Sequence, residues 1–360
     1  MSEKDTTRVV VGLSGGVDSS AAASLLVEKG FDVIGITLKV WPQDCVSRAE
    51  DKCCGPQAVM DARSVADKLN IPYYLIDESK EFQRDVIDYF AAEYKSGRTP
   101  NPCVMCNEKL KFGNLINRAK KLGAEYVATG HYARLEKRNG RTVMLRGKDA
   151  RKDQTYFLFS LGQDQLSHMM FPLGELQKKE TREVARCVSL KTAEKQESQE
   201  ICFVPDNDYK KFLTTAGLVN EHRGEIVNTK GHVLGYHDGI EFYTIGQRKG
   251  LGISSPKALY VIGLDPKSNQ VVVGGEEMLM RTEFYIDRCN WIPFEKLEGP
   301  IDVLAAIRYN HPGASATVEP VESGKAIVRL HEPQRAITPG QACVFYQDDL
   351  VLGGGWIMRD

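Results

Sequence analysis

The sequence predicts an α/β protein: a Rossmann-like parallel sheet covered by helices, then a small β-rich central domain, then a C-terminal antiparallel β-barrel. Two observations lead to this fold class. Up to about residue 208, apolar runs alternate with helical patterns, as in parallel sheets that are buried on both faces. Beyond it, short segments separated by glycine take over, which is typical of antiparallel sheets and barrels. We therefore expect domains at residues 1–208, 209–272 and 273–360.

The first strand–turn–helix unit contains a glycine-rich loop. An apolar run over residues 9–13 is followed by SGGVDSS at 14–20 and by a helical pattern over 21–29. Such a junction leaves backbone N–H groups unpaired at the positive end of the helix dipole, and Gly15 and Gly16 let an anion approach them. The loop is therefore predicted to bind phosphate. It has no lysine, which excludes the Walker pattern, but it has three serine hydroxyls and Asp18.

The α/β alternation continues through the first domain. We expect strands at residues 31–40, 72–77 and 124–130, and helices at 57–69, 81–94 and 108–122. Residues 97–107 contain Pro100 and Pro102 and cannot be regular up to the second proline, because proline lacks a donor and disfavours helix in the residue before it. A stiff loop is therefore predicted to present Cys103 and Cys106.

The end of the fourth predicted strand is part of the candidate site. The carboxyl ends of parallel strands line the ligand crevice in open α/β sheets. We therefore expect Gly130 and His131 beside the bound ligand, although His131 could equally be a core histidine whose hydrogen bonds are satisfied.

A basic region follows. Alternating segments on either side of Asn139–Gly140 predict a hairpin over residues 134–146, and its tip is basic. More basic side chains follow between residues 146 and 154 and could contact RNA phosphates. A solvated charged turn is the alternative, and charge alone favours it. Helices are then expected at residues 155–161 and 178–190.

The nine cysteines of the chain do not suggest a disulfide framework, because an odd number leaves one unpaired and a cytosolic chain keeps its thiols reduced. The adjacent Cys53 and Cys54 are interpreted as packing residues, with a metal role as the minor alternative, and Cys45 has no assigned role. Cys202 lies between two large apolar residues, as core cysteines do. The polar segment 192–200 just before it is what favours a functional role.

Composition narrows the class of protein. The 47 basic and 48 acidic side chains nearly cancel, so RNA binding would need local patches rather than a global field. No apolar run approaches the roughly 20 residues that span a membrane. The N-terminus lacks the layout of a signal peptide. We therefore expect a cytoplasmic protein with no membrane partner.

Together these motifs resemble one family. SGGVDS matches the loop of the N-type ATP pyrophosphatase superfamily, and its six matching positions disfavour the alternative of a glycine-rich helix start that only forms a turn. The whole chain resembles the tRNA-specific 2-thiouridylases, known as MnmA or TrmU. The resemblance rests on GLSGGVDSS at 12–20, GRTPNPCVMCNEKLKF at 97–112, ATGHYAR at 128–134, KDQTYFL at 152–158, ICFVPD at 201–206, YTIGQRKGLGI at 243–253, and Arg308–Tyr309.

The resemblance implies an ATP-pyrophosphatase fold and sulfur insertion at C2 of the wobble uridine (U34) in the tRNA anticodon loop. ATP would be consumed to AMP and pyrophosphate, with Mg²⁺ as the cofactor. It implies Cys106 as nucleophile, Cys202 as persulfide carrier, and Asp18 as a catalytic residue. ATP would be bound by Gly12, Leu13, Ser14, Gly15, Gly16, Val17, Asp18, Ser19, Leu38 and Gly130, and tRNA by Asn101, Pro102, Cys103, Lys152, Asp153, Gln154, Arg308 and Tyr309. A sulfur-donor protein, either a sulfur relay or a cysteine desulfurase, and a monomeric state are also expected.

Cys103 departs from the family pattern. Many members have aspartate there, and a general acid–base role cannot pass to a cysteine. In the persulfide mechanism, sulfur from Cys202 reaches the activated C2 and a Cys106–Cys202 disulfide results. Alternatively, Cys103, Cys106 and Cys202 are three thiolates that could hold a [4Fe–4S] cluster with one open iron. The extra cysteine tilts the balance towards the cluster, and a closed zinc site is less attractive.

Two other functions compete with thiolation. One is a small-molecule ligase of the same superfamily, although no glutaminase-like cysteine starts the chain and the β-rich half suits an RNA platform better. The other is a nucleotide-gated carrier in which Cys103, Cys106 and Cys202 only hold cargo.

Overall fold

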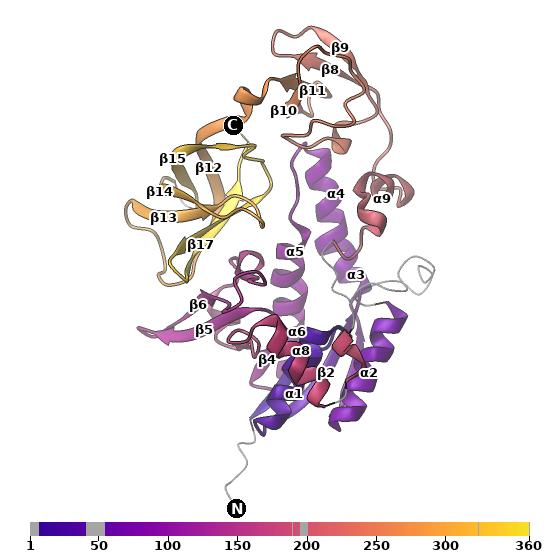
Figure 1. Cartoon of the computed structure of the whole chain (residues 1–360), viewed down its shortest axis with the longest axis vertical. Helices are drawn as coiled ribbons and strands as arrows, with labels where there is room; N and C mark the ends of the chain where they lie inside the picture. The colour runs from indigo at the N-terminus through magenta and orange to yellow at the C-terminus, as the bar shows by residue number, and fades with distance from the viewer. Residues whose placement is uncertain (1–6, 41–54, 189, 195–200, 323, 360) are drawn as a thin grey trace, which may run out of the picture. The chain divides into compact units, whose positions relative to one another are not determined.

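The computed structural model describes residues 7–40, 55–188, 190–194, 201–322 and 324–359 (Figure 1). Cys45, Cys53 and Cys54 lie outside these residues. The chain forms two compact units, each assembled from several segments. The first contains residues 1–86, 103–207 and 349–351, and the second contains residues 87–102, 208–348 and 352–360. This division places residues 87–102 with the later part of the chain, whereas the three domain boundaries expected from sequence stay a prediction.

The first unit is built on a parallel sheet, which confirms the α/β prediction. Its strand order is β3-β2-β1-β4-β7, and every adjacent pair is parallel. The strands are β1 (Arg8–Gly12), β2 (Asp32–Lys39), β3 (Tyr73–Asp77), β4 (Tyr126–Ala128) and β7 (Met169–Met170). Val9, Val10 and Val11 of β1 are fully buried, because this strand lies in the middle of the sheet. Its C-terminal end therefore opens into the centre of the crevice.

Helices pack on this sheet because of their small apolar residues. The helices are α1 (Val17–Glu28), α2 (Pro56–Leu69), α3 (Ser79–Phe82), α6 (Leu115–Lys121), α7 (Gln163–Leu166) and α8 (Lys178–Cys187). Ala21 and Ala22 of α1 are fully buried and belong to one apolar cluster with Tyr132 and Leu173. Val184 of α8 packs against the same cluster, so alanines let α8 approach α1 closely.

The segment with the two neighbouring cysteines differs from the prediction. Helix α5 (Pro102–Met105) begins at the second proline and continues into a π-helical stretch, Cys106–Asn114, and then into α6. Cys103 and Cys106 therefore lie on helix, whereas sequence predicted a loop. The reason is that proline is favoured in the first turn of a helix, where its missing N–H costs nothing.

The basic hairpin is confirmed, and the helix expected after it is wrong. Strands β5 (Ala133–Arg138) and β6 (Arg141–Arg146) are antiparallel. Asn139 and Gly140 between them have φ of 49° and 77°, as a two-residue hairpin turn requires. Of the helix expected at 155–161, only a 3₁₀ turn over Thr155–Phe157 forms. Leu350, from the short C-terminal segment of this unit, pairs with Leu145.

The second unit combines helices with a four-stranded sheet. Helix α4 (Asp88–Lys95) contacts α9 (Tyr209–Thr215) through stacked Tyr94 and Tyr209 rings, whose centroids are 4.6 Å apart. The sheet has the order β10-β11-β8-β9, formed by β8 (Gly224–Asn228), β9 (Val233–His237), β10 (Tyr260–Asp265) and β11 (Gln270–Gly274). Strands β8 and β11 are parallel, and the other pairs are antiparallel.

The C-terminal part of the second unit is a closed antiparallel barrel, as predicted. Its strand order is β12-β15-β14-β13-β16-β17, and a further β12–β17 pairing closes it. The strands are β12 (Met280–Trp291), β13 (Ile301–Ala306), β14 (Ala314–Pro320), β15 (Ala326–Arg335), β16 (Ala342–Gln347) and β17 (Leu350–Ile357). Gly353 lies where β17 crosses β12, and a Cβ there would be 2.0 Å from the carbonyl oxygen of Asn290.

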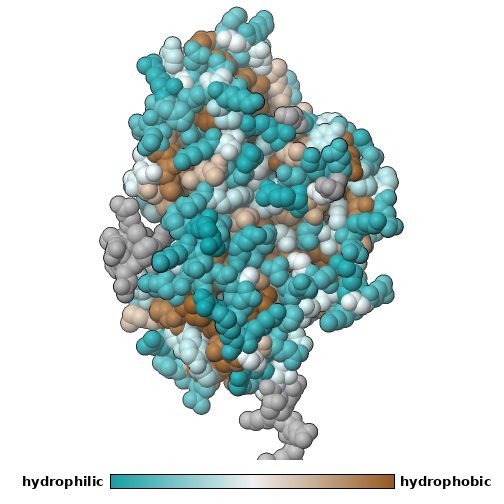
Figure 2. Space-filling view, turned by 180° about the vertical axis from the view of Figure 1, so that it is seen from behind, coloured by the Kyte–Doolittle hydropathy of each residue, from teal (hydrophilic) through white to brown (hydrophobic). Residues whose placement is uncertain are grey.

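The face of the molecule that Figure 2 presents is mainly hydrophilic. Figure 2 shows polar residues over most of the face that it presents, with hydrophobic residues exposed in separate areas. Within the described part of the chain, no helix is both long enough and apolar enough to cross a membrane.

Candidate nucleotide and thiol site

The glycine-rich loop connects the central strand β1 to helix α1, as the sequence predicted. Gly15 has φ of +69°, and a Cβ there would be 2.2 Å from the carbonyl oxygen of Ala58, so only glycine fits. Ser14 N donates to Ser19 Oγ at 3.1 Å, and Ser20 Oγ donates to Gly16 O at 2.8 Å. The loop is thus tied to the first turn of α1. The N-cap residue Gly16 has no side chain to cap that turn, which suits an anion ligand.

Gly130 lies against the start of α1, next to the loop. A Cβ at Gly130 would be 2.6 Å from the carbonyl carbon of Asp18 and 2.7 Å from Ser19 N. The residue follows β4, the neighbour of β1 in the sheet. The structure therefore places Gly130 against Asp18 and Ser19 of the loop, and its role in binding ATP stays a prediction. Leu38 lies at the C-terminal end of β2, the other neighbour of β1.

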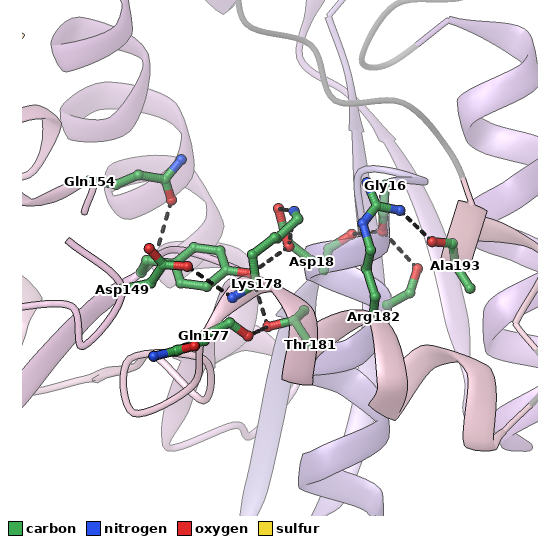
Figure 3. A network of polar contacts seen from close by, with 12 residues as sticks. Gly16, Asp18, Asp149, Gln154, Gln177, Lys178, Thr181, Arg182 and Ala193 are labelled. Atoms are coloured by element: carbon green, nitrogen blue, oxygen red, sulfur yellow. Dashed lines mark hydrogen bonds and ion pairs between the residues drawn. The ribbon is translucent and has the colours of Figure 1, made fainter. Parts of the chain in front are cut away.

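Asp18 is held by two residues that sequence reasoning did not single out (Figure 3). Lys178 Nζ is 2.7 Å and 2.8 Å from the two carboxylate oxygens of Asp18. The hydroxyl of Tyr132 donates to Asp18 Oδ1 at 2.9 Å and lies 2.9 Å from Thr181 Oγ1. The ammonium also lies 5.7 Å from the centre of the Tyr132 ring, a cation–π distance. A lysine that the loop itself lacks is thus supplied by helix α8.

His131 is a core histidine, which settles the two alternatives for its environment. Its ring packs between Phe112 and Phe171, and its Nδ1 lies 2.7 Å from Thr129 Oγ1. Burial, with a smaller effect of Lys111, holds the pKa of His131 well below its ordinary value. The ring is therefore neutral at physiological pH.

Cys103 and Cys106 lie three residues apart on the helical segment, and both are partly exposed. Burial raises the pKa of Cys103 to about 11, with a smaller contribution from Cys106 and an opposing one from Lys111. Cys103 is therefore a thiol at neutral pH, not a thiolate. Gln165 supports the π-helical stretch, because its Nε2 donates to the carbonyl oxygens of Phe112 at 2.9 Å and Glu108 at 3.2 Å.

Cys202 is partly exposed while the residues after it are buried. The ring of Phe203 packs edge-on against Phe82, with centroids 5.7 Å apart, and Val204 N donates to Ile201 O. This anchors the segment and leaves Cys202 partly exposed, unlike a fully buried core cysteine. The six cysteines in the described ranges carry no disulfide bond. Residues 195–200, just before this segment, lie outside the described residues.

The three cysteines expected to hold a cluster are not assembled as a ligand set. Across the described ranges, no three His, Cys, Asp or Glu side chains lie close enough together to hold a metal ion. The raised pKa of Cys103 also disfavours the thiolate that an iron–sulfur ligand must be. The residues present therefore do not fit a cluster held by Cys103, Cys106 and Cys202.

Two of the three tRNA-contact residues expected after the hairpin form internal hydrogen bonds. Asp153 accepts from Gly147 N at 3.1 Å and from Thr155 Oγ1 at 2.8 Å, and burial raises its pKa. Gln154 Oε1 accepts from Tyr132 N at 3.1 Å. These side chains fix the turn in place. Lys152 is partly exposed, and its backbone N–H donates to Asp149 O.

The other expected tRNA-contact residues, apart from Cys103, belong to the second unit. Arg308 and Tyr309 are exposed in the turn after β13. Asn101 is buried, and the carbonyl oxygens of the two residues before it, Thr99 and Pro100, accept from Gln341 Nε2 at 3.2 Å and 3.0 Å. Pro102 is the last residue of this segment of the unit, and Cys103 starts the next segment of the first unit.

Comparison with known proteins identifies the family of this chain. Residues 7–206 match the family described as tRNA methyl transferase HUP domain, 210–275 its PRC-barrel domain, and 281–357 an aminomethyltransferase beta-barrel domain. The tRNA-specific 2-thiouridylase MnmA of Clostridium perfringens is 50% identical over 351 residues, covering 97% of this chain and 98% of that protein. The MnmA proteins of Moorella thermoacetica and Clostridium acetobutylicum are 50% and 48% identical, covering 97% of this chain and 98% and 99% of theirs. The descriptions of the matching domains mention methyl transfer. The relatives, however, match this chain over nearly their whole length and are named as thiouridylases. The chain therefore belongs to the tRNA-specific 2-thiouridylase family.

Proposed function

We propose that the protein is an ATP-dependent tRNA 2-thiouridylase that acts on C2 of the wobble uridine. One observation carries this proposal: the lysine-free SGGVDSS loop and the partly exposed Cys106 and Cys202 all belong to one compact unit. Such a unit would combine an anion site for ATP with two partly exposed cysteines that could act as sulfur nucleophiles. The names of the relatives support tRNA as the substrate.

The first step is adenylation of the base. The C2 oxygen of uridine attacks the α-phosphate of ATP, pyrophosphate leaves, and the oxygen becomes part of an AMP leaving group. The residues that would bind ATP are those of the loop over 12–19, with Leu38 and Gly130 at the same edge of the sheet. Asp18 and the neighbouring serine hydroxyls are hard oxygen donors and suit Mg²⁺, which usually takes one or two carboxylates plus phosphate oxygens. Bound Mg²⁺ would neutralise phosphate charge.

The second step transfers sulfur. A donor protein, either a sulfur relay or a cysteine desulfurase, loads Cys202 as a persulfide. In one route the terminal sulfur attacks C2, and Cys106 then attacks Cys202 Sγ and breaks the bond between Cys202 and the transferred sulfur. In the other route Cys106 attacks the persulfide first and releases hydrosulfide, which attacks C2. In both routes AMP leaves, the transferred sulfur is reduced, and the two cysteines are oxidised to a disulfide that an external thiol must reduce. The absence of a three-ligand cluster among the described residues and the raised pKa of Cys103 support this persulfide route over an iron–sulfur cluster.

Contacts to tRNA come next. Lys152 and Arg308 would contact phosphates, and the exposed Tyr309 ring, 40% exposed, offers a stacking surface for a base. Asp153 and Gln154 would act with them by holding their turn in place. Asn101, Pro102 and Cys103 would line the pocket of the target base. The protein would act as a monomer in the cytoplasm.

The decisive experiment measures 2-thiouridine in tRNA by mass spectrometry after incubation with ATP and a sulfur donor. Cys106→Ser and Cys202→Ser should each abolish thiolation and leave ATP affinity unchanged, because neither sulfur belongs to the glycine-rich loop. Cys187→Ser, at an exposed position on α8, is the matched control and should retain activity.

Two results would contradict the proposal. Thiolation at the wild-type level in either variant would exclude the persulfide–disulfide route. Iron bound by protein purified without oxygen, and lost together with activity in Cys103→Ser, would favour a cluster instead.

A further inference from the structure

The glycine-rich loop lacks the positive charge that phosphate binding normally uses. It offers backbone N–H groups, the hydroxyls of Ser14 and Ser19, and the Asp18 carboxylate, which is negative. The terminal phosphates of ATP also carry negative charge, so Asp18 alone would repel them. A side-chain cation from elsewhere in the fold would, together with Mg²⁺, offset this repulsion.

Lys178 places a cation at this point. It is the first residue of α8, and its side chain reaches Asp18 in the first turn of α1, as Figure 3 shows. Its ammonium contacts both carboxylate oxygens, and the Lys178 side chain is only 12% exposed, against 32% for Asp18. The ammonium of Lys178 is thus largely shielded from water and lies next to a loop that is predicted to bind anions.

A purely structural ion pair explains this arrangement less well. Asp18 already receives a hydrogen bond from Tyr132 and lies in the first turn of a helix, where the dipole favours a carboxylate. Desolvating a lysine to add a further partner gives little or no net stability. The ammonium makes a more favourable interaction when a phosphate group enters the loop, because the attraction between opposite charges is stronger in a site that is partly shielded from water.

The backbone around Lys178 is fixed, so only the side chain would need to move. Its N–H donates to Asp149 Oδ2 at 3.0 Å, and Gln177 N donates to Glu180 Oε2 at 2.6 Å in a capping box. Thr181, on the next turn, is hydrogen-bonded to Tyr132. The start of α8 is thus held in place from several directions.

We propose that Lys178 is the phosphate-binding lysine of this enzyme. Without nucleotide its ammonium neutralises Asp18. With ATP it contacts the oxygens of the β- and γ-phosphates, and Asp18 becomes available to Mg²⁺. The inference rests on the proposed function and assigns a specific role within it: Lys178 recognises the pyrophosphate that leaves during adenylation, and it does not recognise the nucleoside.

Binding measurements on the full chain test this role. Calorimetry would compare Mg–ATP, AMP and Mg–pyrophosphate for the wild type, Lys178→Met, Lys178→Arg and the control Lys179→Met, whose residue is exposed on the same helix. Lys178→Met should weaken ATP and pyrophosphate binding by about tenfold or more and change AMP binding by about twofold at most. Lys178→Arg should fall between Lys178→Met and the wild type, and Lys179→Met should bind like the wild type.

The ratio of ATP to AMP affinity decides the outcome. An equal loss for ATP and AMP, or no loss for ATP, would make Lys178 a structural residue and overturn the inference. If Lys178→Met does not fold, Lys178→Arg keeps the positive charge, and its ATP-to-AMP ratio gives the answer. A wild-type protein that does not bind ATP, or does not thiolate tRNA, would instead contradict the proposed function itself.

Discussion

Gly130 controls how closely strand β4 approaches the start of α1. A Cβ at this position would be 2.6 Å from the carbonyl carbon of Asp18, 2.7 Å from Ser19 N and 2.9 Å from Asp18 Cβ. These atoms belong to the backbone or lie next to it, so they cannot rotate away as the end of a flexible side chain could. Any larger residue must therefore displace the first turn of α1, which carries the anion site.

Gly130→Ala should lower both stability and ATP affinity. Overpacking of this kind costs about 1–3 kcal/mol of unfolding free energy, and the displaced turn should weaken ATP binding about tenfold or more because its N–H groups no longer converge. Thermal melting and calorimetry would measure the two effects. Gly299→Ala is the control, because a Cβ there meets no atom within 4 Å. Wild-type ATP affinity in Gly130→Ala would show that this close approach is not needed for binding.

At the residue scale, the sequence could predict features formed by residues that are close together in the chain, but not contacts between distant residues. The place of the SGGVDSS loop between a strand and a helix was predicted correctly because these elements follow one another within a few residues, whereas its binding of phosphate stays a prediction. Lys178 was missed because it is 160 residues from Asp18, and nothing in a helix start indicates which loop its first side chain reaches. Tyr132 lies within the recognised ATGHYAR motif, but only the fold gives its partner.

At the element scale, the helical segment that carries Cys103 and Cys106 is fastened to the sheet by a buried carboxylate. Glu78 follows β3 and is completely buried. It accepts from Asn114 Nδ2 at 2.7 Å and from Arg118 at 3.1 Å and 3.3 Å. The Arg118 side chain, by contrast, is 41% exposed. If the ion pair is broken, water can solvate the charge of Arg118 but not the charge of Glu78.

Arg118→Met should therefore destabilise the protein more than Glu78→Gln. Without Arg118, the fully buried carboxylate keeps the hydrogen bond from Asn114 but loses its charged partner, which costs about 3 kcal/mol. Glu78→Gln keeps an acceptor oxygen and leaves an arginine that water can reach, which costs about 1 kcal/mol. Urea unfolding followed by circular dichroism would measure both. Arg84→Met is the control, because Arg84 forms its ion pair at the surface; the reverse order of the first two variants would contradict the argument.

The same segment marks where element prediction failed. Two prolines suggested a loop, but Pro102 is compatible with the first turn of a helix. The π-helical stretch that follows is supported by the distant Gln165, whose Nε2 donates to two carbonyl oxygens of the stretch. The prediction of a helix at 155–161 was also wrong because of side-chain hydrogen bonds that the sequence does not show. The carboxylate of Asp153 accepts hydrogen bonds from Thr155 N and Oγ1 and fixes a tight turn. The apolar residues after this turn are buried without continuing as a helix.

At the scale of the whole molecule, the chain passes between its two units several times. Residues 87–102 leave the first unit and join the second, where Arg98 pairs with Glu93 and Thr99 N donates to Pro339 O. Such grouping depends on contacts between segments far apart in sequence, so composition could not predict it. The fold classes of the parts were predictable, because strand and turn patterns are local.

The residues proposed to bind ATP all belong to the first unit. The effect of bound ATP on the stability of each unit can therefore be tested. The loop over 12–19, Leu38, Gly130 and Lys178 lie within residues 1–86 and 103–207. A ligand that binds only the folded state stabilises the structure that holds its site, by about 2.7 kcal/mol at a concentration of about one hundred times Kd. The stabilisation should therefore be greatest in the first unit.

Hydrogen exchange followed by mass spectrometry would locate this effect. With saturating Mg–ATP, amides of β1, α1, β4 and α8 that exchange by unfolding of the unit should slow by up to about one hundredfold, because their opening now requires ATP to dissociate. Amides of β13, β14 and β15 in the barrel should change little. Gly130→Ala at the same ATP concentration should lose most of the protection. Protection concentrated in the barrel, or equal in both units, would place the nucleotide elsewhere and remove the structural basis for assigning adenylation to the first unit.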